Sequence, residues 1–282
     1  MSRIRQGCAI GLLIVGIGLF LFPIISQLYQ DYNHSEVIRA YEVSIGALTL
    51  AEKEEMWKQA ENYNQQLREQ VTLENPFIQA LGELNIDYER LLNPQGDGIM
   101  GYIEIPRIHV YLPIGHGTEE DTLQNGVGHL LNSSLPVGGA STHAVLSAHT
   151  GLPGIQLFDE LDELKEGDLF YLHILGETLA YQVDQIKVVL PYEVEDLKAI
   201  EGEDHVTLLT CTPYGINSHR LLVRGDRIPY VEEEVPTVGH FEIKDVIDWV
   251  PYGICLVVIC GLMAWKLRKE RRKKREKKND SL

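Results

Sequence analysis

The spacing of apolar residues changes near residue 99, and the change divides the chain into two regions. Residues 34–70 are rich in Glu, Gln, Lys and Ala and contain no proline, and their apolar positions recur at the spacing of a helix. We predict one or two helices there, with Gly46 marking a break. After residue 99, short β-branched and aromatic runs alternate with turn-forming residues, which is typical of strands.

The second region contains eight candidate strands and two candidate short helices. Strands are expected at residues 99–105, 108–114, 126–131, 142–149, 168–175, 178–190, 204–211 and 219–227, and helices at 119–124 and 193–200. Many short strands within one domain favour a β-barrel or a β-sandwich. The chain is therefore expected to be mainly β, with an N-terminal helical extension.

Two uncharged runs lie outside these regions, at residues 6–30 and 249–265. Both reach the length that spans a bilayer, and each has basic residues on its outer side, which are expected to stay in the cytoplasm. This pattern predicts two transmembrane helices, with both termini in the cytoplasm and the domain between them extracellular. A cleaved signal peptide is the alternative for the first run, and a buried core helix is the alternative for the second.

These patterns predict six segments along the chain. They are a membrane span that serves as a signal anchor (1–30), a helical extension (31–98), a β domain (99–228), a linker (229–248), a second span (249–265) and a basic cytoplasmic tail (266–282).

Charge is distributed unevenly between the ends of the chain and its middle. The 282 residues carry 25 basic and 41 acidic side chains, for a formal net charge of −16. The first 25 residues and residues 266–282 together hold 12 of the basic and 3 of the acidic side chains, which leaves −25 on the stretch between them. So acidic a domain argues against nucleic acid as a partner.

Cys211 is the only cysteine outside the predicted spans, since Cys8, Cys255 and Cys260 fall within them. It has no partner for a structural disulfide in the external domain, and a four-cysteine zinc site is excluded there. An unpaired cysteine in an oxidising compartment is either buried and inert or used for chemistry. Both interpretations remain open at this point.

A hairpin is predicted to bring an arginine to this cysteine. Cys211 ends one predicted strand and Arg220 begins the next, with the turn formers Pro213, Gly215 and Asn217 between them. Arg220 would then lie opposite Cys211, whereas Arg224 would lie about 13 Å deeper along the strand. Arg220 could stabilise a thiolate or an oxyanion; the alternative is a surface arginine at a strand end.

A histidine is the expected general acid/base, and all ten histidines lie in the external domain. His149 ends a predicted strand and enters a loop, a common place for catalytic groups. Other histidines remain candidates on residues alone: His116, His129, His143 and His219. A metal site built from His129, His143 and His149 is a further alternative, although no metal-ligand motif is present, and no cofactor-binding motif is found.

Four segments together resemble the sortase family. They are Thr207-Leu208-Leu209-Thr210-Cys211 with Arg220 nine residues later, Ser147-Ala148-His149-Thr150-Gly151-Leu152-Pro153, Gly101-Tyr102-Ile103-Glu104-Ile105-Pro106, and Leu135-Pro136-Val137-Gly138-Gly139. The helical extension and the second span are similar to those of class C, the pilus-assembling sortases.

The resemblance implies an eight-stranded closed β-barrel at a Gram-positive cell surface and needs no cofactor. It implies that Cys211 is the nucleophile, that His149 is the acid/base, and that Arg220 stabilises the tetrahedral intermediate. An LPXTG-like signal would be cleaved and its acyl group passed to a lysine amine of a pilin subunit. Three alternatives remain: a housekeeping sortase using a lipid II-type amine of peptidoglycan, a thiol protease, and a non-catalytic membrane-tethered binding domain.

Class C enzymes also carry a lid with an Asp-Pro-aromatic motif before the barrel. The nearest match is Asn75-Pro76-Phe77, in which asparagine stands in place of aspartate. An ionic contact from this lid to Arg220 therefore cannot form, although Phe77 could still pack over Cys211. The alternative is an ordinary turn containing proline.

Overall fold

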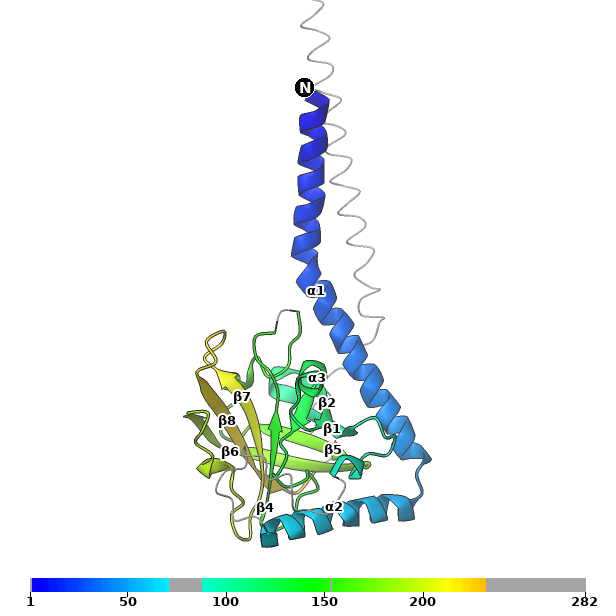
Figure 1. Ribbon diagram of the computed structural model, residues 1–282, viewed down its shortest axis with the longest axis vertical. Coiled ribbons are helices and arrows are strands. Elements are labelled where there is room, and N and C mark those ends of the chain that lie inside the picture. The colour runs from blue at the N-terminus through cyan, green and yellow to red at the C-terminus, as the bar shows by residue number, and fades with distance from the viewer. Residues whose placement is uncertain (1, 71–87, 153, 232–282) are drawn as a thin grey trace, which may run out of the picture. The chain divides into compact units, whose positions relative to one another are not determined.

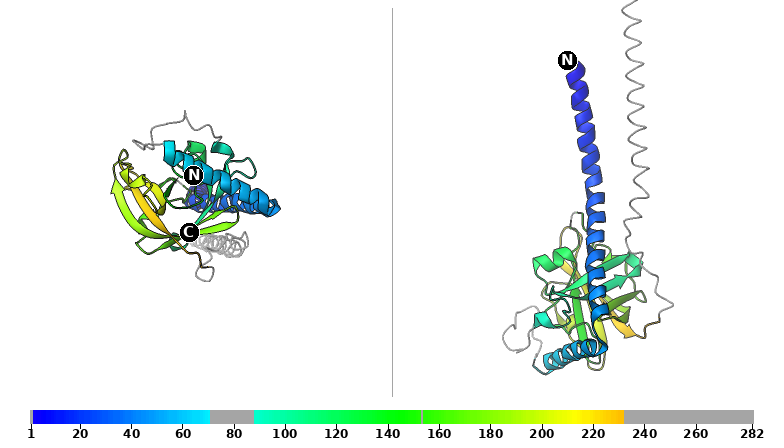
Figure 2. Two further views of the ribbon diagram at one scale, coloured as in Figure 1. Left: turned by 90° about the horizontal axis from the view of Figure 1, so that it is seen from below. Right: turned by 90° about the vertical axis from the view of Figure 1, so that its right-hand side faces the viewer.

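The computed structural model describes residues 2–70, 88–152 and 154–231, which all belong to one compact unit, Met1–His240. Two helices, α1 (Ser2–Ala47) and α2 (Leu50–Gln70), precede a barrel of short strands (Figures 1 and 2). The expected break at Gly46 is confirmed, because α1 ends one residue later.

The start of α2 is fixed by a capping box. The Thr49 hydroxyl accepts the backbone N–H of Glu52, and the Glu52 carboxylate accepts the backbone N–H and hydroxyl of Thr49. This exchange satisfies backbone donors that the first turn of a helix leaves free. The chain therefore turns and starts a second helix at Thr49.

One face of α1 packs on the barrel through Ile38, Tyr41 and Ile45, which recur at helical spacing and are buried. The Tyr41 hydroxyl donates to the carbonyl of Met100 at 2.9 Å and accepts the backbone N–H of Leu175 at 2.8 Å. Burial raises the pKa of Tyr41, so the phenol stays protonated and keeps both bonds. One side chain thus ties the helix to two parts of the barrel wall.

The second helix packs on the barrel in a similar way through Ala60, Tyr63 and Leu67. The side chain of Asn64 exchanges two hydrogen bonds with the backbone of Leu135, at 2.7 and 3.1 Å. The helical extension expected from residues 34–70 is therefore part of the same packed core as the barrel.

The strands form a closed barrel in the order β1-β2-β3-β4-β7-β8-β6-β5, which confirms the eight-stranded barrel that the resemblance implied. They are β1 (Ile99–Ile105), β2 (Val110–His116), β3 (Val127–His129), β4 (Thr142–Ser147), β5 (Leu169–Ile174), β6 (Glu177–Val189), β7 (Asp204–Thr212) and β8 (His219–Ile228). Each lies close to its predicted range.

The two expected short helices differ in outcome. The first is α3 (Glu120–Asn125). At residues 193–200 the helix is shorter than expected, a single 3₁₀ turn over Glu195–Leu197. Its backbone bonds reach back three residues instead of four, and the segment ends before an α-helical turn can be propagated.

The pairing of β7 with its neighbours decides which residues meet. β4 and β7 run parallel, with Ser147 opposite Leu209, whereas β7 and β8 are antiparallel. The C-terminal ends of β4 and β7 therefore reach the same edge of the barrel, and β8 begins there.

No helix among residues 2–70, 88–152 and 154–231 is both long and apolar enough to cross a membrane. The second uncharged run, 249–265, lies outside the described residues.

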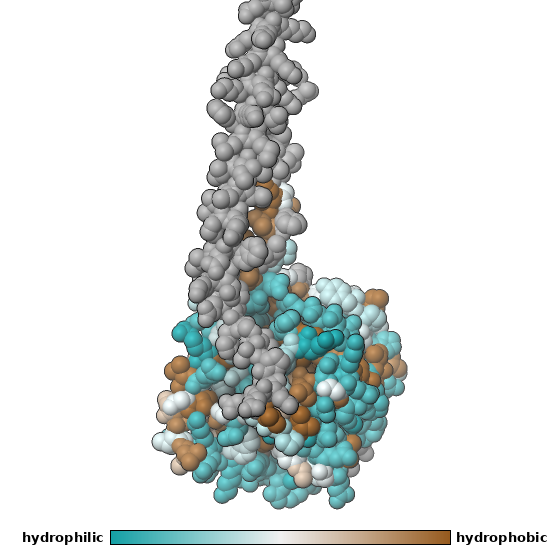
Figure 3. All heavy atoms as spheres, turned by 180° about the vertical axis from the view of Figure 1, so that it is seen from behind, coloured by the Kyte–Doolittle hydropathy of each residue, from teal (hydrophilic) through white to brown (hydrophobic). Residues whose placement is uncertain are grey.

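Apolar side chains are nevertheless exposed on α1 between residues 15 and 25. They include Val15, Ile17, Leu19, Leu21, Phe22 and Ile25. Figure 3 shows hydrophobic colour on the described part of this helix, whereas hydrophilic colour dominates the visible face of the barrel.

Candidate active site

Cys211 is the second-last residue of β7 and carries a free, half-buried thiol. Residues before it in the strand, such as Leu208 and Thr210, are buried, whereas Pro213 and Tyr214 after it are exposed. The thiol therefore sits where the packed barrel gives way to the surface, so a substrate can reach a sulfur atom that the strand holds in place.

Arg220 lies directly opposite Cys211 in the β7–β8 ladder, which confirms the predicted register. Its Nη1 donates to the carbonyls of His219 and Asn217, at 3.1 and 3.3 Å. Among the described residues, no carboxylate lies within ion-pair distance of this guanidinium. Its positive charge is oriented by the backbone but not neutralised, as stabilising a developing anion requires.

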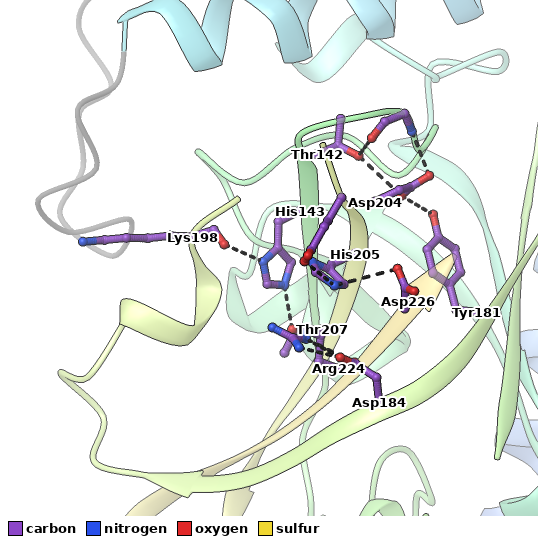
Figure 4. A network of polar contacts seen from close by, with 12 residues as sticks. Thr142, His143, Tyr181, Asp184, Lys198, Asp204, His205, Thr207, Arg224 and Asp226 are labelled. Carbon is purple, nitrogen blue, oxygen red and sulfur yellow. Dashed lines mark hydrogen bonds and ion pairs between the residues drawn. The ribbon is translucent and has the colours of Figure 1, made fainter. Parts of the chain in front are cut away.

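Arg224 is engaged elsewhere, although it lies in the same strand. It pairs with Thr207 across the ladder, and its guanidinium forms a bidentate ion pair with Asp184 of β6 (Figure 4). The hydrogen bonds to Asp184 raise the pKa of Arg224. Its donors are therefore committed to the barrel wall, which agrees with the choice of Arg220 made on register.

His149 lies two residues beyond the end of β4, at the same edge as Cys211. The ladder with β7 continues past Ser147, because Ala148 N–H donates to Leu209 at 3.1 Å and the Thr210 hydroxyl donates to the Ala148 carbonyl at 2.8 Å. Continuing the parallel register by one more residue sets His149 beside Cys211. The three residues singled out from the sequence thus come from three adjacent strand ends.

A compact loop holds the backbone after His149. The carbonyl of His149 accepts the N–H of Phe158 at 3.1 Å. The carboxylate of Asp159 accepts the N–H groups of Gly151 at 2.8 Å and Leu157 at 2.9 Å. These bonds close the loop onto itself, so the chain leaving His149 has a defined path.

Known proteins match this geometry. A family model for the sortase domain matches residues 103–228. Sortase C1 of Streptococcus agalactiae, solved in complex with MTSET and as a lid mutant, is 49% identical with a TM-score of 0.63; each match covers 70% of this chain and 99% of that chain. The chain belongs to the sortase family.

Within the family it groups with class C. A sortase C of Streptococcus pneumoniae is 48% identical with a TM-score of 0.62, covering 69% of this sortase and 97% of that chain. The curated sortase A of Streptococcus agalactiae is 32% identical over 117 residues, which is 40% of this sortase and 47% of that protein. The chain thus spans about half the length of this curated relative.

Two other candidate histidines of the sortase are used for structure. His143 of β4 is buried, with Nδ1 near the Lys198 carbonyl at 3.0 Å and Nε2 near the Thr207 hydroxyl at 2.7 Å (Figure 4). His129 is also buried, with Nε2 near the Ser134 carbonyl at 2.8 Å and Nδ1 near the Tyr88 hydroxyl at 2.7 Å. Burial lowers the pKa of each to about 4, so both are neutral at physiological pH.

His116 and His219 make other contacts, and His219 Nδ1 lies 2.9 Å from the Ser218 hydroxyl. The two ring nitrogens of His116 contact the carbonyls of Gly98 and Leu91, at 2.9 and 2.7 Å. His219 opens β8 opposite Thr212, one position beyond the Cys211–Arg220 pair. Within the described part of the chain, no group of three or more His, Cys, Asp or Glu side chains is arranged to hold a metal ion.

The predicted lid residues, Asn75, Pro76 and Phe77, lie outside the described residues. The structure adds residues near the site that the sequence did not single out. Glu120 of α3 places a carboxylate oxygen 3.7 Å from His149 Nε2, and Tyr214 packs against Gly151 in the loop after His149. No sequence signal marks either contact, since each joins segments that are distant along the chain.

A hollow of about 260 Å³ lies beside the earlier part of β4. Its wall includes Arg68 of α2, His143 and Val145 of β4, and Glu201. Cys211, His149 and Arg220 do not line it. The reactive edge of the barrel is thus separate from this hollow.

Proposed function

We propose that this sortase is a pilus-assembling transpeptidase that acts through a Cys211 thioester. The observation that carries the proposal is the pairing of Cys211 with an Arg220 that is free of carboxylate partners among the described residues, next to the strand end that bears His149. Sortases are transpeptidases. The related Streptococcus pneumoniae sortase C has been studied for pilin substrate specificity, and another solved relative is the sortase C1 of a pilus island.

The chemistry has two balanced steps. The Cys211 sulfur attacks the threonine carbonyl carbon of an LPXTG-like signal, the Thr–Gly C–N bond breaks, and the glycine amine leaves with a proton from His149. A lysine amine of a pilin subunit then attacks the thioester, the C–S bond breaks, and the thiol is restored. Arg220 stabilises the oxyanion that forms in each step.

A lid is proposed to shield the thioester until the acceptor binds. Transfer to an amine in water needs an intermediate that is protected from hydrolysis. Asn75-Pro76-Phe77 is the segment proposed for this role, supported by its match to the class C motif and by the existence of a lid in Streptococcus agalactiae sortase C1.

Membrane attachment through residues 6–30 and 249–265 is part of the proposal, with the barrel outside the cell and both termini in the cytoplasm. Its support is the absence of charge in these runs and the basic residues on their outer sides. Protease treatment of intact cells tests it: the barrel should be cleaved while a tag after residue 282 stays protected.

Mass spectrometry of Cys211 tests the reaction. The full chain is incubated with a sorting-signal peptide, with and without a lysine-bearing pilin fragment or a lipid II-type amine. An acyl adduct on Cys211 that is released faster by the pilin lysine supports pilus assembly, and faster release by the lipid II-type amine favours the housekeeping alternative. Release by water alone identifies a thiol protease, and no adduct at all contradicts the transpeptidase.

A matched pair of histidine variants accompanies this experiment. His149→Ala should lose most of the adduct, whereas His109→Ala, which changes an exposed histidine in the turn before β2, should keep it. Equal adduct in both variants would contradict the role of His149.

A further inference from the structure

The contact between α3 and His149 is not explained by the three residues described so far. Glu120 lies in the first turn of α3, and its Oε2 is 3.7 Å from Nε2 of His149. This is an ion-pair distance but longer than a hydrogen bond. Nε2 itself is shielded from solvent and has no hydrogen-bond partner among the described residues, where the carboxylate is the polar group that it faces.

The carboxylate is held near the histidine by its own helix. Its other oxygen, Oε1, accepts a hydrogen bond from the Gln124 side chain one turn later, at 2.7 Å. This bond restricts the rotation of the Glu120 side chain and leaves Oε2 directed toward the imidazole.

The other groups around His149 do not offer this nitrogen a carboxylate. The Asp159 oxygens are occupied by the Gly151 and Leu157 N–H groups. Cys211 and Arg220 belong to β7 and β8, and neither side chain is a carboxylate. Tyr214 contacts the loop at Gly151 and carries a phenol, not a carboxylate.

We propose that Glu120 is a positioning residue for His149. A carboxylate beside Nε2 favours the tautomer that carries its proton on that nitrogen, because the N–H can then donate toward the negative charge. Nδ1 is then the nitrogen that remains free to exchange a proton with Cys211. The same carboxylate favours the imidazolium that forms when the thiol gives up its proton. A base oriented by a third group in this way is the general arrangement of an activated nucleophile.

This inference rests on the proposed function, because it assigns a part in the thioester reaction to Glu120. Two measurements distinguish a failure of this inference from a failure of the proposed function. The first is the rate of Cys211 thioester formation with a sorting-signal peptide. The second is the tautomer of His149, read from ¹⁵N chemical shifts of histidine-labelled full chain, with the signal assigned by its loss in His149→Gln.

The variants are Glu120→Ala, Glu120→Gln and the matched control Asp121→Ala. Asp121 is the next acidic residue of the same short helix and is exposed, so its replacement tests the loss of a negative charge in α3 alone. Glu120→Gln keeps an oxygen that can accept from Nε2 but removes the charge.

We expect Glu120→Ala to lower kcat for thioester formation about three- to tenfold with little change in KM, because a half-exposed charge pair is worth only a modest amount. The ¹⁵N spectrum should show a smaller population of the Nε2–H tautomer. Glu120→Gln should recover the tautomer and part of the rate, and Asp121→Ala should match the unchanged protein in both readouts.

The inference is overturned if Glu120→Ala and Asp121→Ala give the same kcat and the same histidine spectrum. A different outcome would overturn the proposed function alone: the unchanged protein forms no thioester, while Glu120→Ala still alters the His149 tautomer.

Discussion

Two arginines of β8, four residues apart, have different kinds of partner in the fold. Arg224 is locked into a bidentate pair with Asp184 beside the buried His143, whereas Arg220 contacts backbone carbonyls at the barrel edge. The two histidines of the β4 segment repeat the difference. Both nitrogens of His143 have hydrogen-bond partners, whereas Nε2 of His149 has none among the described residues and lies 3.7 Å from the Glu120 carboxylate.

The comparison shows that β8 and the β4 segment each contribute to two kinds of site. One is structural and lies within the barrel wall, and the other is the candidate active site at the barrel edge. Within the strands, the polar groups of His143 and Arg224 have partners, which stabilises the wall because unpaired buried groups are costly. At the strand ends the same residue types keep unused donors and acceptors, which a reacting substrate can then engage. The following predictions test this division, beginning with the largest expected effect.

Removing the sulfur should separate activity from folding completely. Cys211→Ala should abolish pilin polymers and the acyl adduct, because the other three cysteines, Cys8, Cys255 and Cys260, all lie in the two uncharged runs and not in the barrel. The free energy of unfolding should stay within about 1 kcal/mol of that of the original protein, since the side chain is small and only half-buried. Polymers that persist in this variant would rule out the Cys211 mechanism.

Replacing each of the two arginines by alanine tests whether Arg220 and Arg224 have different roles. Arg220→Ala should lower kcat about 10²- to 10³-fold, the usual loss for one oxyanion-stabilising donor, with little change in stability. Arg224→Ala should instead lower the free energy of unfolding by about 1–3 kcal/mol, because Asp184 loses its partner, while the remaining folded protein stays active. Steady-state kinetics and urea unfolding measure the two effects, and the reverse assignment would contradict the role given to register.

The buried histidines should make the fold sensitive to acid. Burial lowers the pKa of His143 to about 4, below the ordinary value near 6.5, so between these values the unfolded chain binds more protons than the folded one. The stabilisation from this neutral histidine is complete above pH 6.5 and is lost as the pH falls toward 4. The loss amounts to at most about 3 kcal/mol.

Urea unfolding between pH 7 and 4.5 checks this prediction. His143→Gln should flatten the acid-side decline relative to the original protein, even if its stability at pH 7 is lower. The exposed His109, replaced by Asn, serves as the control and should leave the slope unchanged. A slope that is the same in both variants would show that His143 titrates normally in the fold.

The smallest effect is expected from the proposed lid. Phe77→Ala should speed alkylation of Cys211 by about two- to fivefold, because a single aromatic contact is worth about 0.5–1 kcal/mol. The neighbouring substitution Asn75→Ala should have less effect, since no ionic anchor can form there. An alkylation rate that does not change in Phe77→Ala would contradict cover by this residue.

Sequence reasoning reached the strands and the Cys211–Arg220 pair because both depend on local signals, whereas the closed barrel was implied by the family resemblance. Alternating apolar positions and turn formers mark strand ends, and a hairpin turns the spacing of two residues into a register. The capping pair Thr49 and Glu52 is equally local, three residues apart, but it was not among the sequence predictions.

The contacts that escaped prediction join distant segments. Glu120 reaches His149 from another helix, and Tyr41 reaches Leu175 across 134 residues. Among the histidines, partners decide the role, and the partners of His143 are themselves remote: Lys198 and Thr207 lie 55 and 64 residues away. The sequence of β4 and the residues after it therefore does not show which of His143 and His149 has hydrogen-bond partners.

The parallel pairing of β4 with β7 also has a consequence for the order in which parts of the barrel fold. Thr210 and Ala148, which join the two strand ends, are 62 residues apart in sequence, and β5 and β6 lie between them along the chain. Contacts of such long range require closure of a large loop, which slows their formation. In a newly made chain, the strand ends that carry His149 and Cys211 therefore come together late, after the intervening β5 and β6 have been synthesised.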